Sequence, residues 1–141
     1  MSNHIEIEEW IKNALAVLKL SGRRMETVES ERVLSAVQRR FVHGAPRVWW
    51  LGFGTINSSQ AVETSRLSSL VEDSDEIGWF IPETEGGGNL VYRLTAKEVE
   101  AVVEDCPFFE YYFLDAGEQR LIAETDHNQF VIASPVPDSL T

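Results

Sequence analysis

A chain of 141 residues, of which 43% are hydrophobic and 25% charged, has the length and composition of one globular domain. This composition excludes the disordered class, and a single cysteine excludes an intramolecular disulfide and a zinc-binding cysteine cluster. From this length we expect one domain over residues 1–141. Because a net charge of −11 repels phosphate backbones, we also expect that the protein does not bind nucleic acid.

The N-terminal residues lack the basic start and the apolar middle of a secretory signal, since Glu6, Glu8 and Glu9 occur there. No apolar run in the chain approaches the roughly 20 residues that a membrane helix needs. We therefore expect a cytoplasmic protein that has no membrane as a partner.

Apolar residues recur at helical spacing in several segments, which predicts about four helices. The predicted helices run from about His4 to Leu20, Glu31 to Val42, Ser58 or Ser59 to Glu72, and Thr95 to Asp105. Gly22 is expected to end the first helix, and Thr95 and Glu98 have the spacing of a capping box at the start of the last. The acidic run Glu72 to Glu76 is typical of a solvated loop.

Strand-forming residues predict the sheet. The segments Ile77 to Ile81 and Leu90 to Leu94 predict a hairpin with a long loop. The segment Cys106 to Ala133 predicts a three-stranded meander with turns at Asp115 to Gly117 and at Asp126 to Asn128. The sequence thus predicts a single α+β domain, with about four helices packed on an antiparallel sheet of about five strands.

The first turn of the meander sets its predicted register. If Gly117 takes the left-handed conformation of a three-residue loop, Leu114 lies opposite Glu118 and Tyr111 lies opposite Leu121. One face of the meander then has the pattern of a core. The other face mixes apolar and polar side chains, so we expect it to be partly covered and able to bind a partner; its polar members are Glu110, Tyr112, Arg120 and Glu124.

The adjacent tryptophans Trp49 and Trp50 lie in an aromatic-rich segment, Arg47 to Gly54. Two neighbouring tryptophans are difficult to bury on one side of a strand, and such residues belong to cores or interfaces. Burial against the helices and contact with a partner or ligand both remain open. In the second case, Trp49, Trp50 and Trp79 would line an apolar ligand pocket.

Charge is distributed unevenly along the chain. Residues 1–47 contain eight basic and six acidic residues (+2), whereas residues 48–141 contain four basic and seventeen acidic residues (−13). An acidic C-terminal part predicts a basic protein partner. The alternative is internal, with the basic helices lying against an acidic sheet.

One group of residues could carry chemistry, namely Glu124, Asp126 and His127. A histidine with two carboxylates suits a metal ion or acid–base catalysis. Asp and Asn in a hairpin turn also have a structural explanation, because their side chains bond to nearby backbone groups. Since no catalytic signature accompanies this group, we expect no catalytic residue, no metal and no cofactor, with a metal-dependent hydrolase as an alternative.

The run Cys106 to Tyr112 (CPFFEYY), together with Leu121 to Asn128 (LIAETDHN), resembles the C-terminal part of a family of small bacterial proteins of unknown function. Such families often occur among the immunity proteins of toxin systems. The resemblance covers about the last third of the chain, with the paired tryptophans as a further point of similarity. It implies a bacterial cytosolic protein and supplies no catalytic residues.

These observations predict a non-enzymatic protein-binding module, most concretely an immunity protein that neutralises a basic toxin. The alternatives are a small ligand-binding or sensing domain and the hydrolase named above. The expected partner-binding residues are Glu110, Tyr112, Arg120, Glu124, Asp126, His127, Trp49 and Trp50.

Overall fold

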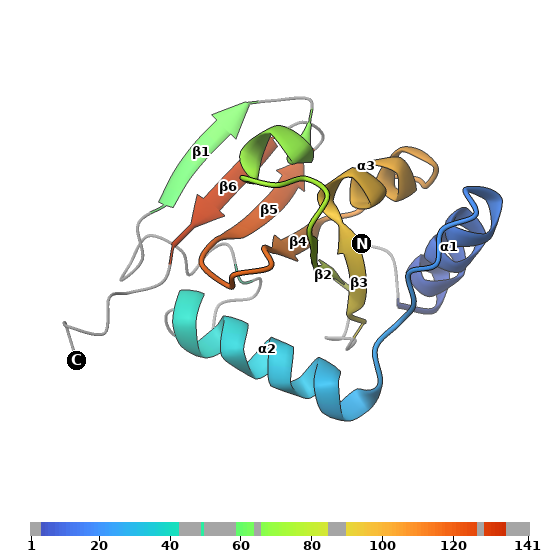
Figure 1. Ribbon diagram of the computed structural model, residues 1–141, viewed down its shortest axis with the longest axis horizontal. Coiled ribbons are helices and arrows are strands. Elements are labelled where there is room, and N and C mark those ends of the chain that lie inside the picture. The colour runs from blue at the N-terminus through green and yellow to red at the C-terminus, as the bar shows by residue number, and fades with distance from the viewer. Residues whose placement is uncertain are drawn as a thin grey trace.

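The computed structural model describes residues 4–42, 49, 59–63, 66–84, 90–126 and 129–134. Its helices are α1 (His4–Val17), α2 (Thr27–Phe41) and α3 (Ala96–Glu104), with a short 3-10 helix, η2 (Leu67–Leu70). Its strands are β1 (Ser59–Glu63), β2 (Ile77–Pro82), β3 (Tyr92–Thr95), β4 (Tyr111–Leu114), β5 (Leu121–Asp126) and β6 (Gln129–Ala133). The chain is therefore an α+β protein, as predicted (Figure 1).

All the strands belong to one six-stranded sheet with the order β1-β6-β5-β4-β2-β3. Every neighbouring pair is antiparallel, which confirms the predicted antiparallel sheet. Strand β5 lies in the interior between β4 and β6, and the two edges are β1 and β3. Antiparallel neighbours that follow each other along the chain need only short connections, so β4, β5 and β6 pair in sequence.

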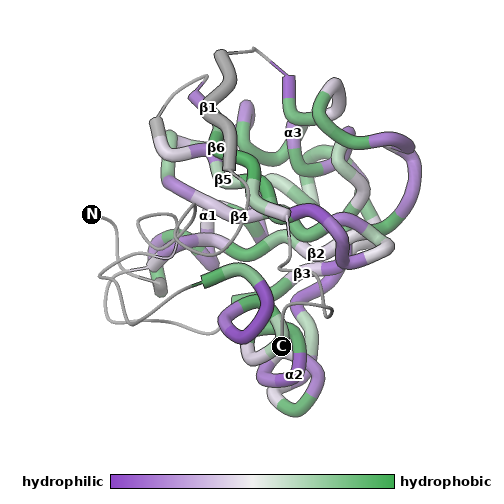
Figure 2. The backbone as a smooth tube through the Cα atoms, turned by 90° about the vertical axis from the view of Figure 1, so that its left-hand side faces the viewer, coloured by the Kyte–Doolittle hydropathy of each residue, from purple (hydrophilic) through white to green (hydrophobic). Residues whose placement is uncertain are grey.

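Helices cover both faces of the sheet. On one face, α1 and α3 bury Ile11 and Val102 against a cluster that includes Phe80, Phe113 and Ile122. On the other face, α2 buries apolar side chains against the same strands; this second cluster includes Val33, Val37, Ile81, Tyr112 and Leu121. In Figure 2 the hydrophobic residues concentrate in the strands, whereas the turns of α2 alternate between hydrophilic and hydrophobic. Every residue of β4 is consequently buried, as expected for a strand covered on two sides.

The described residues form three α-helices, so the prediction of about four is wrong. The segment predicted as a helix from Ser58 or Ser59 to Glu72 contains strand β1 and the 3-10 helix η2 instead. Strand β1 pairs with β6 from Ser59 opposite Ala133 to Glu63 opposite Gln129. Pairing with a sheet edge thus overrides the helical spacing of the apolar residues in this segment, and it adds a sixth strand to the sheet.

The predicted boundaries of the first two helices are also corrected. Helix α1 ends at Val17, where Lys19 has a φ of 58° and the Leu20 N–H donates to the Leu15 carbonyl at 3.0 Å. This is the Schellman arrangement, so Lys19 ends the helix in place of Gly22. Helix α2 begins at Thr27, one turn before the predicted start at Glu31. In α3, by contrast, the capping box of Thr95 and Glu98 is confirmed in both of its hydrogen bonds.

The register between β4 and β5 differs from the predicted one by three residues. Leu114 lies opposite Leu121, and Tyr111 lies opposite Glu124. The reason is a longer loop, in which Asp115 Oδ1 accepts hydrogen bonds from the backbone N–H groups of Gln119 (2.8 Å) and Arg120 (3.1 Å). The left-handed residue of this loop is Glu118, with a φ of 55°, and not Gly117. The turn predicted at Asp126 to Asn128 lies mostly outside the described residues.

Two glycines provide a test of this packing. A Cβ atom at Gly78 in β2 would lie 2.5 Å from the Leu114 carbonyl oxygen and 2.6 Å from the Phe113 ring, whereas at Gly117 the nearest atom is 3.8 Å away. We expect Gly78→Ala to lower the free energy of unfolding by roughly 1–3 kcal/mol, because a backbone oxygen in a sheet cannot move aside easily. Gly117→Ala should leave it within about 0.5 kcal/mol of the parent value or raise it. Urea unfolding of both variants measures this difference, and equal stabilities would contradict the described β2–β4 packing.

Candidate functional site

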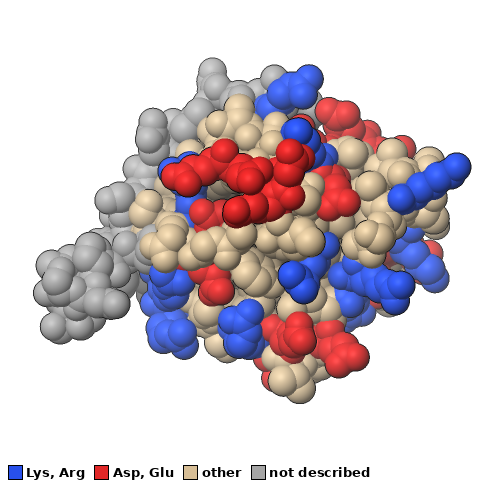
Figure 3. Space-filling view, viewed as in Figure 1, with Lys and Arg blue, Asp and Glu red and all other residues tan. Residues whose placement is uncertain are grey.

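One concave surface with a mainly acidic lining lies between the loop that joins η2 to β2 and the loop that joins β4 to β5. It is a groove of about 260 Å³, whose charged lining residues are Glu72, Asp73, Glu76, Asp115 and Arg120. We refer to it as the acidic groove. Figure 3 shows acidic side chains gathered on this face of the molecule, over the loop that follows η2.

Arg120 holds the two loops of the acidic groove together. Its Nη1 donates a hydrogen bond of 2.6 Å to the carbonyl oxygen of Leu70, at the end of η2. Its own backbone N–H donates to Asp115, the residue that organises the β4–β5 loop. Arg120 is the one cationic side chain that lines the groove in the described part of the chain, and it is engaged with the protein backbone. It therefore acts first as a structural support.

The carboxylates of the groove differ in their local roles. Asp73 Oδ1 accepts a hydrogen bond of 2.9 Å from the Asp75 N–H, and the Asp73 carbonyl accepts one of 3.2 Å from the Glu76 N–H. These bonds close a turn with side-chain support. Glu72 and Glu76 are exposed and have no ion-pair or hydrogen-bond partner for their carboxylates among the described residues. The groove thus presents negative charge that suits an ammonium or guanidinium group from a partner.

Two of the predicted partner-binding residues lie beneath α2. Tyr112 is 1% exposed and belongs to the core cluster on that face. Its ring packs against the partly buried Trp49, with 5.0 Å between ring centroids. Trp79 packs against the same cluster, and its indole N–H is buried without a hydrogen-bond partner among the described residues. For Trp49 the structure therefore favours burial against a helix, and Trp50 lies outside the described residues.

Glu124 lies on the opposite face of the sheet from Tyr112. It is 6% exposed, and it accepts a hydrogen bond from the hydroxyl of Tyr111, the residue opposite it on β4. Burial, together with the charge of Glu124 and this hydrogen bond, raises the pKa of Tyr111 well above 10. The tyrosine therefore stays protonated at neutral pH, and its hydroxyl donates to a carboxylate that is itself buried.

The predicted binding face does not exist as one surface. Tyr112 and Glu124 point to opposite sides of the sheet, Arg120 lines the acidic groove, and Glu110 precedes β4, where its carbonyl accepts a hydrogen bond of 2.9 Å from Glu83. The expectation of one mixed, partly open face is wrong, because the register differs by three residues and α2 covers the second face. That these residues bind a partner stays a prediction. Asp126 is the last residue of β5, and His127 lies outside the described residues.

Cys106 is partly buried against the α1 and α3 cluster. Burial, followed by the charge of Asp105, raises its pKa to about 11. The thiol therefore stays protonated at neutral pH and is a poor nucleophile. Among the residues that the structure describes, no three histidine, cysteine or carboxylate residues form a group that could hold a metal ion.

The acidic groove was missed at the level of sequence. Its signal is the acidic run from Glu72 to Glu76, which has the same composition as an ordinary solvated loop. The other charged residues of the groove, Asp115 and Arg120, belong to the connection between β4 and β5, which comes much later in the chain. Only the tertiary structure brings them together.

The role of Glu124 is testable by comparison with Glu110. We expect Glu124→Ala to lower the free energy of unfolding by about 1–3 kcal/mol, because it leaves the buried hydroxyl of Tyr111 without its acceptor. Glu110→Ala should cost less than about 0.5 kcal/mol, since the described hydrogen bond of Glu110 involves its backbone. Urea unfolding monitored by circular dichroism measures both. A Glu124→Ala protein as stable as the Glu110→Ala protein would contradict the structural role.

None of the described helices is long and apolar enough to cross a membrane. Comparison with protein-family models, with curated proteins and with solved structures gives no match. Arguments about function therefore start from the residues of this chain.

Proposed function

We propose that this protein is a non-enzymatic binding module that takes a basic segment of a partner protein into the acidic groove. The observation that carries this proposal is the presence of four carboxylates in one groove, where, among the described residues, the single cationic side chain of the lining is engaged with the backbone. Carboxylates without an internal cation gain most from a cation that arrives with a partner.

The whole-protein charge supports the same partner. A net charge of −11 attracts a basic protein over a distance of about one Debye length and speeds its association. Contacts within the groove then slow its dissociation. An immunity protein that neutralises a basic toxin is the most concrete form of this function. It agrees with the resemblance of the C-terminal segment to a family of small bacterial proteins of unknown function, since such families often occur among immunity proteins.

The residues proposed for contact differ from those that the sequence suggested. Glu72, Asp73 and Glu76 are exposed and border the groove, so they are the proposed anchors. Arg120 keeps a place at the site as the residue that holds its two loops together. Glu124 and Tyr112, in contrast, are buried in the two cores, where they support the fold.

The two alternative functions receive less support. A hydrolase based on Glu124 would need this carboxylate to face a substrate, but it is buried and bonded to Tyr111. A ligand pocket based on tryptophans would need them to line an open cavity, but Trp49 and Trp79 pack against the core under α2. We therefore retain the protein-binding function alone.

The proposal predicts that charge position matters more than total charge. We compare a groove variant, Glu72→Gln with Asp73→Asn and Glu76→Gln, with a control variant, Glu9→Gln with Glu31→Gln and Glu104→Gln. Both change the net charge from −11 to −8, and all three control residues are exposed and lie outside the groove. With an immobilised lysine-rich peptide at physiological ionic strength, the groove variant should bind at least about tenfold more weakly, and the control less than about threefold.

Biolayer interferometry at two ionic strengths separates the contribution of contacts within the groove from the contribution of long-range charge. Loss of groove contacts should appear mainly as faster dissociation, whereas loss of remote charge should slow association at low salt alone. Equal weakening in the two variants would show that the groove has no special role. Absence of binding by the parent protein would contradict the proposed function itself.

A further inference from the structure

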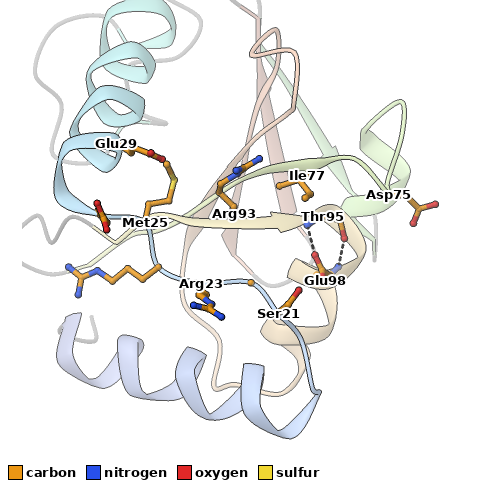
Figure 4. Close-up of a pocket in the computed structure, with 12 residues that line it drawn as sticks. Ser21, Arg23, Met25, Glu29, Asp75, Ile77, Arg93, Thr95 and Glu98 are labelled. Atoms are coloured by element: carbon orange, nitrogen blue, oxygen red, sulfur yellow. Dashed lines mark hydrogen bonds between the residues drawn. The ribbon is translucent and has the colours of Figure 1, made fainter.

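A second and larger groove lies at the sheet edge formed by β3. It has a volume of about 560 Å³ and is lined by the connection between α1 and α2, the first turn of α2, and residues of β2, β3 and α3. We refer to it as the edge groove. It shares no lining residue with the acidic groove. Figure 4 shows its residues, with the capping box of Thr95 and Glu98 at one end.

The α1–α2 connection forms one wall of the edge groove because it attaches to β3. The Met25 N–H donates a hydrogen bond of 2.7 Å to the Val91 carbonyl, and Arg24 forms an antiparallel bridge with Tyr92. At Gly22 the connection comes so close to Leu94 that no Cβ atom would fit without a shift of that side chain. The edge strand is thus covered by the chain's own backbone, which protects it from pairing with another sheet.

Three charged side chains of the edge groove already have a partner inside the protein. Arg24 forms an ion pair with Glu8 at 2.7 Å, and Asp75 forms one with Lys97 at 3.2 Å. Glu98 accepts a hydrogen bond of 2.8 Å from the Thr95 N–H in the capping box. These groups contribute to the fold of the groove.

Four charged side chains of the groove have no ion-pair or hydrogen-bond partner among the described residues. They are two cations and two anions: Arg23, Arg93, Glu26 and Glu29. A purely anionic ligand would meet repulsion from the glutamates, and a purely cationic ligand would meet repulsion from the arginines. A ligand that carries both signs of charge satisfies both pairs at once.

Apolar surface lies between these charges. Ile77 is 48% exposed, and Met25 is only partly buried against the core under α2. Arg93 lies opposite Trp79 on β2, so it occupies the same face of the sheet, and Figure 4 shows Arg93, Met25, Glu29 and Ile77 on one side of the β3 ribbon. A cationic group, an anionic group and an apolar surface are therefore presented together on this face.

We propose that the edge groove binds a small zwitterion with an apolar side chain, that is, an amino acid or a short peptide with free ends. Its carboxylate contacts the guanidinium of Arg93, its ammonium group contacts Glu29 at the first turn of α2, and its side chain lies on Met25 and Ile77. The volume of the groove lies within the range of small-molecule sites. This site is independent of the proposed protein-binding function.

The test uses the methionine methyl groups as reporters. Met25 lines the groove, and Met1 is the only other methionine of the chain. With ¹³C-methyl methionine, titration with leucine and with leucyl-leucine should move the Met25 signal, assigned through a Met25→Leu variant, in a saturable manner. The two probes separate a single amino acid from a peptide as the ligand. N-acetyl-leucine and leucine amide, which each lack one charge, should bind at least about tenfold more weakly than the better zwitterion.

Matched variants connect this binding to the proposed contacts. Arg93→Gln and Glu29→Gln should each weaken binding at least about tenfold, whereas Arg39→Gln and Glu31→Gln on the exposed part of α2 should leave it unchanged. Unchanged thermal unfolding of all four confirms that they are folded. The proposal is overturned if neither zwitterion shifts the Met25 signal at millimolar concentration, if a singly charged analogue binds as well, or if binding survives both groove substitutions.

Discussion

Burial of both faces of the sheet is the constraint on which the rest of the structure depends. The central strands β2, β4 and β5 are covered by α1 and α3 on one side and by α2 on the other. Their side chains alternate between two cores, so a polar residue in the centre of a strand must find a partner inside the protein. Tyr111 and Glu124 form such a pair on the α1 and α3 side. Polar residues available to other molecules are therefore found in loops and along sheet edges.

Both grooves follow from this arrangement. The acidic groove forms where two loops meet beyond the strand ends, and the edge groove forms where the α1–α2 connection runs along β3. The segment between η2 and β2 borders both, since Asp73 and Glu76 line the first and Asp75 lines the second. A ligand in one groove thus lies close to the loop that shapes the other.

The acidic groove and the edge groove differ in the balance of their charged side chains. In the acidic groove, the guanidinium of Arg120 is bound to the Leu70 carbonyl, which leaves the carboxylates in excess. In the edge groove, ion pairs engage Arg24 and Asp75 and the capping box engages Glu98, which leaves two cations and two anions of the lining without a partner among the described residues. An excess of one sign favours a partner of the opposite sign, whereas a balanced set favours a ligand with both. The same chain therefore offers two sites of different chemical selectivity.

Local features were determined by the sequence itself. The capping box of Thr95 and Glu98 and the three α-helices depend on residues within one or two helical turns of each other, whose spacing is visible in the chain. The β-rich C-terminal part is visible as runs of strand-forming residues separated by turn residues. The tertiary structure alone decided the β4–β5 register, because Asp115 bonds across its loop, and the strand state of Ser59–Glu63, because that segment pairs with β6. It also decided which polar residues are exposed. Helix α2 covers the face of the sheet that was expected to be partly open. Its contacts with β4 and β5 join residues more than 70 positions apart in the chain, so no local sequence pattern indicates them.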